Sequence, residues 1–155
     1  MLRLDAGVPI VVDTNVLVPS IYSETFFYHI LSFCDFTLLW NEFTRSEAHE
    51  IIDRLALNYT NKFDVKLCTE SHETLDLLLC HENKVPEMPA DWQNYSPDRD
   101  DDNFLWVALR GGAKYIITYN QSDLLNLQTF KGIPIGKPHD FKHWAEELYV
   151  KYQAR

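Results

Sequence analysis

The sequence predicts a single α/β domain in which helices cover both faces of a central, mostly parallel sheet, giving three layers. Short apolar, β-branched runs alternate with segments whose apolar residues recur at helical spacing, as in βαβ units. These runs are apolar throughout rather than alternating with polar residues, which is typical of strands buried on both faces. The chain has 155 residues without an evident repeat or linker, so we expect one domain over residues 1–155.

The first elements follow from apolar runs and helix caps. Residues 9–12 are a β-branched apolar run, as expected for a buried strand. Ser23 is a candidate N-cap for a helix over residues 26–34. Residues 36–40 predict a second strand, and Asn41 can cap the helix after it. One line along that helix contains apolar residues and a carboxylate: Phe43, Glu47, Ile51 and Leu55.

The second half of the chain alternates in the same way. Residues 64–81 predict one or two helices, and the prolines in residues 84–97 predict an irregular connection. From Asp98 an acidic turn leads into a helix that ends at Gly111-Gly112, because carboxylates favour helix N-termini and glycine favours C-termini. The remaining pattern predicts a strand at 115–118, a short helix around 122–127, a strand at 132–135 and a helix at 141–152.

The net charge argues against nucleic acid as a ligand. Lysine and arginine total 14 against 23 aspartates and glutamates, which gives a formal charge of −9. So acidic a protein repels phosphate backbones over most of its surface. The composition alone therefore disfavours a nucleic-acid partner, although the motifs below point the other way.

The cysteines and the N-terminal residues bear on the compartment. Cys34, Cys68 and Cys80 are an odd number without CxxC spacing, which predicts neither a disulfide framework nor a zinc site. Buried thiols in a reducing compartment are the simpler interpretation. Residues 1–8 lack a secretion-signal pattern, and no apolar run approaches the ~18 residues that span a bilayer. We therefore expect a cytoplasmic protein without membrane contact.

Acidic and amide residues recur near the carboxyl ends of the predicted strands, where open parallel sheets form their sites. They come from four segments: Asp13, Glu47, residues 98–102, and Asn120 with Asp123. Because like charges repel, such a cluster requires a cation or raised pKa values. Oxygen ligands without nearby histidine or cysteine suit Mg²⁺ or Mn²⁺. The pattern thus predicts a divalent-cation site at one edge of the sheet.

Each of these residues also has a purely structural interpretation. Asp13 could close a turn through its side chain, and Asp123 could cap the short helix after it. Glu47 could pair with Arg45 or Arg54, and carboxylates are common at helix N-termini. The four segments together, rather than one of them, favour the cation site.

The order of these motifs resembles the PIN-domain ribonucleases, and within them the VapC-type toxins of bacterial toxin–antitoxin pairs. The motifs that carry the resemblance are VDTNVL at residues 12–17, RDDDNFL at 99–105, GGAKYIIT at 111–118, the turn at 118–125 and the closing strand at 132–135. The resemblance covers about the whole chain, with a loose match over residues 60–95. It implies a PIN-like fold and an Mg²⁺- or Mn²⁺-dependent endoribonuclease, a hydrolase that cleaves single-stranded RNA with one or two ions.

The resemblance also implies which residues act. Its acidic positions fall on Asp13, Glu47 and Asp101, as metal ligands and catalytic residues. At the fourth position, where many members have aspartate, this chain has Asn120, and Asp123 three residues later is the alternative catalytic carboxylate. Asn120 could supply a neutral oxygen. Small polar residues that orient the first aspartate and the scissile phosphate match Thr14 and Asn15.

Further contributions are less specific. Asp98 or Asp102 could assist Asp101 from the same turn. His49 resembles a general base but is two residues from Glu47, so it faces another side of the helix. The family further implies a homodimer and a cognate antitoxin that inserts a segment into the acidic groove.

Two other functions stay open from the sequence. Asn120 and the acidic surface are compatible with a PIN-fold scaffold that binds RNA or protein with weak or no catalysis. A metal-dependent phosphohydrolase could act on small phosphate esters, but a phospho-aspartate enzyme places a second aspartate where this chain has Asn15. For a ribonuclease we expect weak, metal-dependent and salt-sensitive RNA binding, with Tyr119 or Tyr22 available to stack on a base.

Overall fold

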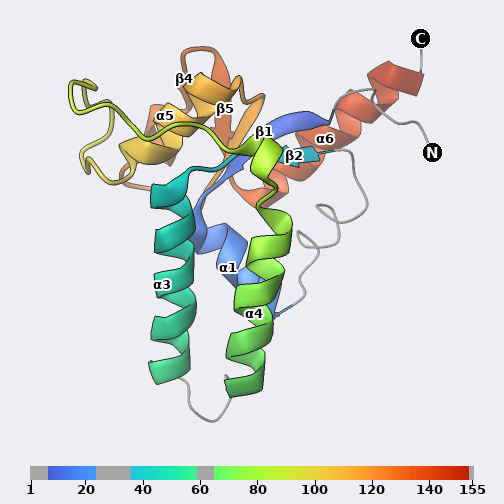
Figure 1. The fold of residues 1–155 in the computed structure, drawn as a ribbon. Helices are drawn as coiled ribbons and strands as arrows, with labels where there is room; N and C mark the ends of the chain where they lie inside the picture. Colours follow the sequence, from blue (N-terminus) through green and yellow to red (C-terminus); the bar gives the residue numbers. More distant parts are fainter. Residues whose placement is uncertain (1–6, 24–35, 59–64, 154–155) are drawn as a thin grey trace.

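A sheet of short apolar strands lies at the centre of the molecule, and helices pack around it (Figure 1). The computed structural model describes residues 7–23, 36–58 and 65–153. Within these residues the strand order is β2-β1-β3-β5-β4, and only β4 runs antiparallel to its neighbour. The bounds are β1 Val8–Val12, β2 Phe36–Leu38, β3 Tyr115–Ile117, β4 Thr129–Phe130 and β5 Ile133–Gly136. This mostly parallel sheet confirms the predicted α/β class.

β1 is the central strand that positions the rest, because it pairs with a parallel strand on each side. Val8 lies opposite Phe36 of β2, and Ile10 lies opposite Tyr115 of β3. Ile10 and Val11 are fully buried, as expected for a strand covered on both faces. The parallel pairing brings the carboxyl ends of β1 and β3 to the same edge of the sheet.

Helices cover both faces of this sheet. Their bounds are α1 Thr14–Tyr22, α3 Glu42–Asn58, α4 Val65–Leu78, α5 Asp102–Gly111 and α6 Pro138–Gln153. Ile10 and Val12 pack into a core formed with α1, α3, α4 and α6, whereas Val11 packs into a second core with α5. Alternate residues of one strand thus enter two cores, which makes the fold three-layered. Among the described residues, none of the helices combines the length and apolar character that crossing a bilayer requires.

Several boundaries lie where the sequence predicts them. Asn41 Oδ1 accepts a hydrogen bond from the N–H of Thr44 at 3.0 Å, so Asn41 caps α3. Ala48 and Ile52 are the most deeply buried residues on the apolar side of that helix. Gly112, with φ of 70°, ends α5 in the left-handed conformation that glycine adopts most readily.

Three elements of the described residues were not predicted: α1, β4 and a short 3-10 helix over His81–Asn83. Ser23 ends α1, where its N–H donates to the carbonyl of Pro19 at 3.1 Å, and its role as the N-cap of a following helix stays a prediction. α1 escaped prediction because apolar residues occupy most of its faces, which removes the helical periodicity. β4 escaped because it has two residues. The helix predicted over residues 26–34 lies outside the described residues.

The predicted acidic helix start at Asp98 was wrong, because α5 begins at Asp102. Asp102 is fully buried and its carboxylate accepts four hydrogen bonds from the connection before it. The donors are Trp92 Nε1 and Tyr95 N–H, both at 2.8 Å, and the N–H and Oγ of Ser96, at 2.9 and 2.7 Å. Burial acts to raise the pKa of this carboxyl, but the hydrogen bonds outweigh burial and lower the pKa. Asp102 therefore anchors the loop and is not available to assist Asp101.

We predict that Asp102→Ala lowers the free energy of unfolding by about 3 kcal/mol, because it leaves two buried donors of Ser96 and two part-buried donors, of Trp92 and Tyr95, without an acceptor. Urea denaturation at neutral pH measures the change, with the exposed Asp91→Ala as control, for which we expect less than about 0.5 kcal/mol. Since the folded-state pKa of Asp102 is lowered, its contribution is present above the ordinary aspartate pKa and declines as the pH falls through the folded value. Equal stability of the two variants would contradict the anchoring role.

Candidate active site

Asp13 is the most deeply buried carboxylate of the predicted site. It follows β1 directly, is 5% exposed, and its N–H donates to the carbonyl of Ile117 at 2.8 Å. Thr118, which follows β3, donates its hydroxyl proton to Asp13 Oδ2 at 2.7 Å. The backbone N–H groups of Thr14 and Asn15, at the start of α1, also face the Asp13 carboxylate. The adjacent ends of two parallel strands and the start of α1 together hold the carboxylate.

Glu47 reaches the same edge of the sheet from α3. Its Oε2 accepts a hydrogen bond from the hydroxyl of Thr14 at 3.0 Å. Because Thr14 directly follows Asp13 in the chain, the carboxylates of Glu47 and Asp13 are near enough to interact. Arg45 does not pair with Glu47; its guanidinium contacts Asp76 Oδ1 at 3.2 Å. The alternative interpretation, an ion pair between Glu47 and Arg45, was therefore wrong, and the hydroxyl of Thr14 binds Glu47 instead.

Asp101 lies in a tight group of carboxylates. One oxygen of each of Asp98, Asp101 and Asp123 lies within 4.8 Å of the others. Asn120 Nδ2 donates to Asp101 Oδ2 at 3.0 Å, while Asn120 Oδ1 accepts the N–H of Asp123 at 3.1 Å. Asn120 therefore closes the turn after β3, and the side chain of Asp123 faces Asp101. This division of roles was left open by the sequence.

Thr118 was missed by sequence reasoning, although it links the two loops of the site. Its Oγ1 accepts the N–H of Asn120 at 2.9 Å while donating to Asp13. Asn15 Oδ1 also accepts the N–H of Tyr119 at 3.2 Å. The available signal was the hydroxyl residue at the end of the predicted strand 115–118, because that strand is the neighbour of the strand that precedes Asp13.

The charges of the site are poorly compensated by protein groups. Burial raises the pKa of Asp13, although the Thr118 hydroxyl and the N–H groups at the start of α1 act in the opposite direction. Burial and then the charges of Asp13 and Asp100 raise the pKa of Glu47, against the Thr14 hydrogen bond. The pKa of Asp101 rises to about 7 through burial, its hydrogen bond with Asp123 and neighbouring negative charge.

These side chains fit a hard divalent cation. Their donors are oxygen atoms, and Mg²⁺ and Mn²⁺ prefer carboxylate, carbonyl and water oxygens. Within the described part of the chain, no lysine or arginine forms an ion pair with Asp13, Glu47, Asp101 or Asp123. A cation would offset the repulsion that raises the pKa of Asp101.

His49 lies away from these carboxylates, as the sequence predicts. Its ring nitrogens contact His72 Nδ1 at 2.6 Å and Asp76 Oδ1 at 2.9 Å, both on α4. It therefore takes no part in the acidic site.

Comparison with known families gives one result. A family model described as PIN domain matches residues 9–122. The matched range includes Asp13, Glu47, Asp101 and Asn120 and stops one residue before Asp123. Searches of curated proteins and of solved structures found no match.

We predict that, without divalent cations, stability falls as the pH rises from the ordinary aspartate value of 3.8 towards about 7. A carboxyl whose folded-state pKa is raised stabilises the fold while it is protonated, and that contribution disappears once it ionises. Asp123→Asn removes one like charge, so it should raise the free energy of unfolding above neutral pH by about 1 kcal/mol after allowance for solvent screening. Denaturation in EDTA measures this, and Glu147→Gln on α6 is the matched control. A destabilised Asp123→Asn protein would show that these charges do not repel.

Proposed function

The chain belongs to the PIN-domain family, and from that premise we propose that it is an Mg²⁺- or Mn²⁺-dependent endoribonuclease acting on single-stranded RNA. The observation that carries this proposal is the group of carboxylates at the carboxyl edge of the sheet. Asp13 is buried against Thr118, and the pKa of Asp101 is about 7 beside Asp98 and Asp123. A functional protein can hold such mutually repelling carboxylates close together when a bound cation offsets their charges.

Each residue has a distinct role in this proposal. Asp13, Glu47 and Asp101 would hold one or two ions, and Asp123 would supply the fourth carboxylate. Asp101 and Asp123 lie together with Asp98, whereas Asp13 acts on Asp101 and on Glu47 as a neighbouring charge. The bound cation supplies neutralisation of a phosphate oxygen and a lowered pKa for an attacking water. Positioning residues hold the carboxylates through hydrogen bonds: Thr118 for Asp13, Thr14 for Glu47 and Asn120 for Asp101.

The exposure of the surrounding residues favours a polymer over a small phosphate ester. Asn15, Asp98, Asp100 and Tyr119 are exposed around the buried Asp13. A chain of RNA can lie along such an open edge, whereas sites for small molecules usually bury most of their ligand. Residue 15 is asparagine, so it does not supply the second carboxylate of phospho-aspartate enzymes, and its Oδ1 accepts the N–H of Tyr119 instead.

We further propose that the protein is the toxin of a toxin–antitoxin pair, acting in the cytoplasm as a homodimer. This part rests on the resemblance of the motifs around Asp13 and Asp101 to VapC-type toxins. A net charge of −9 also suits a partner with a basic segment, because opposite charges attract and steer association. A cognate antitoxin that inserts such a segment into the acidic groove would meet both conditions.

We predict that the protein cleaves labelled single-stranded RNA in Mn²⁺ and that Asp13→Asn and Asp101→Asn each reduce the rate by about 100-fold or more. These changes remove charge from the group that holds the cation while keeping side-chain shape. Glu147→Gln should cleave like the wild type.

Cleavage that persists in EDTA or in Asp13→Asn would overturn the metal-dependent assignment. A wild type that cleaves no member of a diverse RNA pool faster than Asp13→Asn supports the scaffold alternative. Hydrolysis of a small phosphate ester without RNA cleavage supports the phosphohydrolase alternative.

We predict that Tyr119 contributes to RNA binding by stacking. Its side chain is 53% exposed while its N–H is held by Asn15 beside the site. Stacking of a base on an aromatic ring contributes about 1–3 kcal/mol. Tyr119→Ala should therefore raise KM for RNA about tenfold with kcat little changed, whereas Tyr119→Phe should behave like the wild type. Equal KM values for the two variants would exclude stacking at this position.

A further inference from the structure

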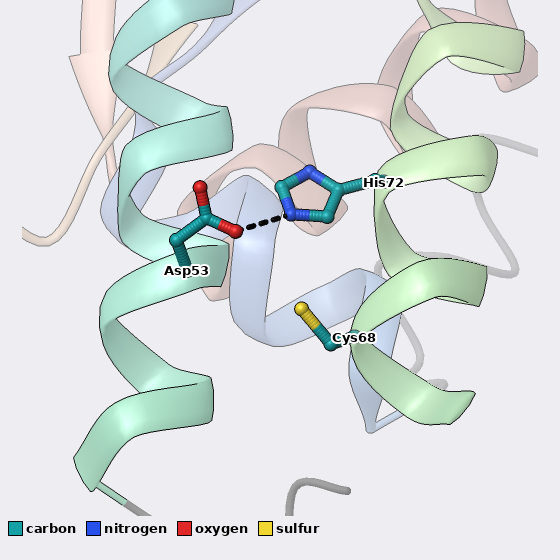
Figure 2. Close-up of side chains that lie close together, drawn as sticks. All are labelled: Asp53, Cys68 and His72. Atoms are coloured by element: carbon teal, nitrogen blue, oxygen red, sulfur yellow. Dashed lines mark hydrogen bonds and ion pairs between the residues drawn. The ribbon is translucent and has the colours of Figure 1, made fainter. Parts of the chain in front are cut away.

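The facing sides of α3 and α4 carry a second group of potential metal ligands, of different chemistry from the acidic site (Figure 2). Asp53 projects from α3, and Cys68 and His72 project from α4. One ligand atom of each residue lies within 4.8 Å of the others. Cys68 and His72 are four residues apart, so they share one side of their helix. Because the ligands come from two helices, no residue spacing within one helix indicates the complete set.

His72 is held in a chain of contacts that fixes its ring. Its Nε2 lies 2.7 Å from Asp53 Oδ1, and its Nδ1 lies 2.6 Å from His49 Nδ1. His49 Nε2 lies 2.9 Å from Asp76 Oδ1, and Arg45 holds Asp76 through a hydrogen bond of 3.2 Å from Nε. The planes of the two imidazole rings are nearly parallel, with 17° between them. The chain of contacts points His72 Nε2 towards Asp53.

The contacts of the ring nitrogens of His49 and His72 require one proton more than two neutral imidazoles carry. Each contact between a ring nitrogen and a carboxylate requires an N–H on the nitrogen, and the contact between the two Nδ1 atoms requires one more. Three protons on two imidazoles make one of them an imidazolium, with no cation bound. If a metal ion takes His72 Nε2, then His72 Nδ1 donates to His49 and His49 Nε2 donates to Asp76. Two neutral rings then satisfy every remaining contact, so a metal ion replaces one proton.

This directional chain is the arrangement that metal-binding histidines use. Their second ring nitrogen almost always donates to a neighbouring acceptor, which fixes the tautomer and the ring orientation. With a metal ion on His72 Nε2, His49 Nδ1 would accept from His72 and His49 Nε2 would donate to Asp76. His49 and Asp76 would be positioning residues rather than ligands.

We propose that Asp53, Cys68 and His72 bind Zn²⁺ or a similar divalent transition-metal ion between α3 and α4. Thiolate and imidazole ligands select such ions over Mg²⁺ and Ca²⁺. The carboxylate and the thiolate together balance the two charges of the ion. Three protein ligands leave a fourth position for water, and the Asp53 side chain is 68% exposed, so the ion can enter from solvent. The site is separate from the acidic edge of the sheet and does not depend on the proposed ribonuclease activity.

Titration with Co²⁺ tests this proposal, because a cysteine ligand produces a thiolate-to-Co²⁺ charge-transfer absorption that carboxylates cannot give. The full chain is titrated under reducing conditions, with excess Mg²⁺ to occupy the acidic site. We expect the absorption to saturate at one equivalent of Co²⁺ and to disappear when Zn²⁺ is added. Asp13→Asn should behave identically, so this result is read independently of RNA cleavage.

Matched variants identify the ligands. Cys68→Ser should abolish the absorption, and Cys80→Ser, which changes an exposed cysteine beyond the end of α4, should retain it. His49→Phe keeps the ring but removes the acceptor, so the absorption should persist at saturation with Co²⁺ affinity reduced about 10- to 100-fold. Circular dichroism should show unchanged helix content in each variant. Absence of the absorption in the wild type, its persistence in Cys68→Ser or its loss in Cys80→Ser would overturn the proposal.

Discussion

Mutual repulsion of desolvated carboxylates is the constraint around which the carboxyl edge of the sheet is organised. A buried aspartate loses hydration, and each neighbouring carboxylate makes its ionisation less favourable. The pairing of β1 with β3 nevertheless holds Asp13 against Thr118, because the backbone hydrogen bonds and apolar cores fix both strand ends. The helices contribute a hydroxyl at Thr14 and a carboxylate at Glu47 to the same edge. The stability of the two cores thus sustains a cluster that would disperse in an unfolded chain.

Neighbouring acidic residues in the sequence serve opposite purposes in the structure. Asp98 and Asp101 face Asp123, whereas Asp102 turns away and binds the connection that precedes α5. The difference follows from the position of the helix start, since the last turn before α5 separates the directions of consecutive side chains. A run of carboxylates therefore supplies both the site and its support. Asn120 likewise has two roles, because its side-chain amide closes a turn and also binds Asp101.

Strong local patterns predicted most of the fold, and long-range polar contacts explain what was missed. The apolar runs that became β1 and β3 could be recognised because strands buried on both faces contain few polar residues. α1 was missed because its apolar residues surround the helix and leave no period. At the acidic edge, topology indicated which segments meet, but it could not show that Thr118 holds Asp13 or that Asn120 rather than Asp123 closes the turn. The His49–His72 pair joins two helices, so no spacing within either one reveals it.

The anchoring of Ser96 to Asp102 has a consequence for how this protein tolerates changes in loop length. Because both the N–H and the hydroxyl of Ser96 bind the Asp102 carboxylate, the chain between them is a closed ring of defined length. Asp98 and Asp101 lie on that ring, so an inserted or deleted residue would rotate both carboxylates relative to Asp123. The segment before Trp92 lies outside the ring, but Arg99 on the ring donates to the carbonyl of Ala90 at 3.2 Å. Diversity in length within this connection is therefore expected before Ala90 rather than between Ser96 and Asp102.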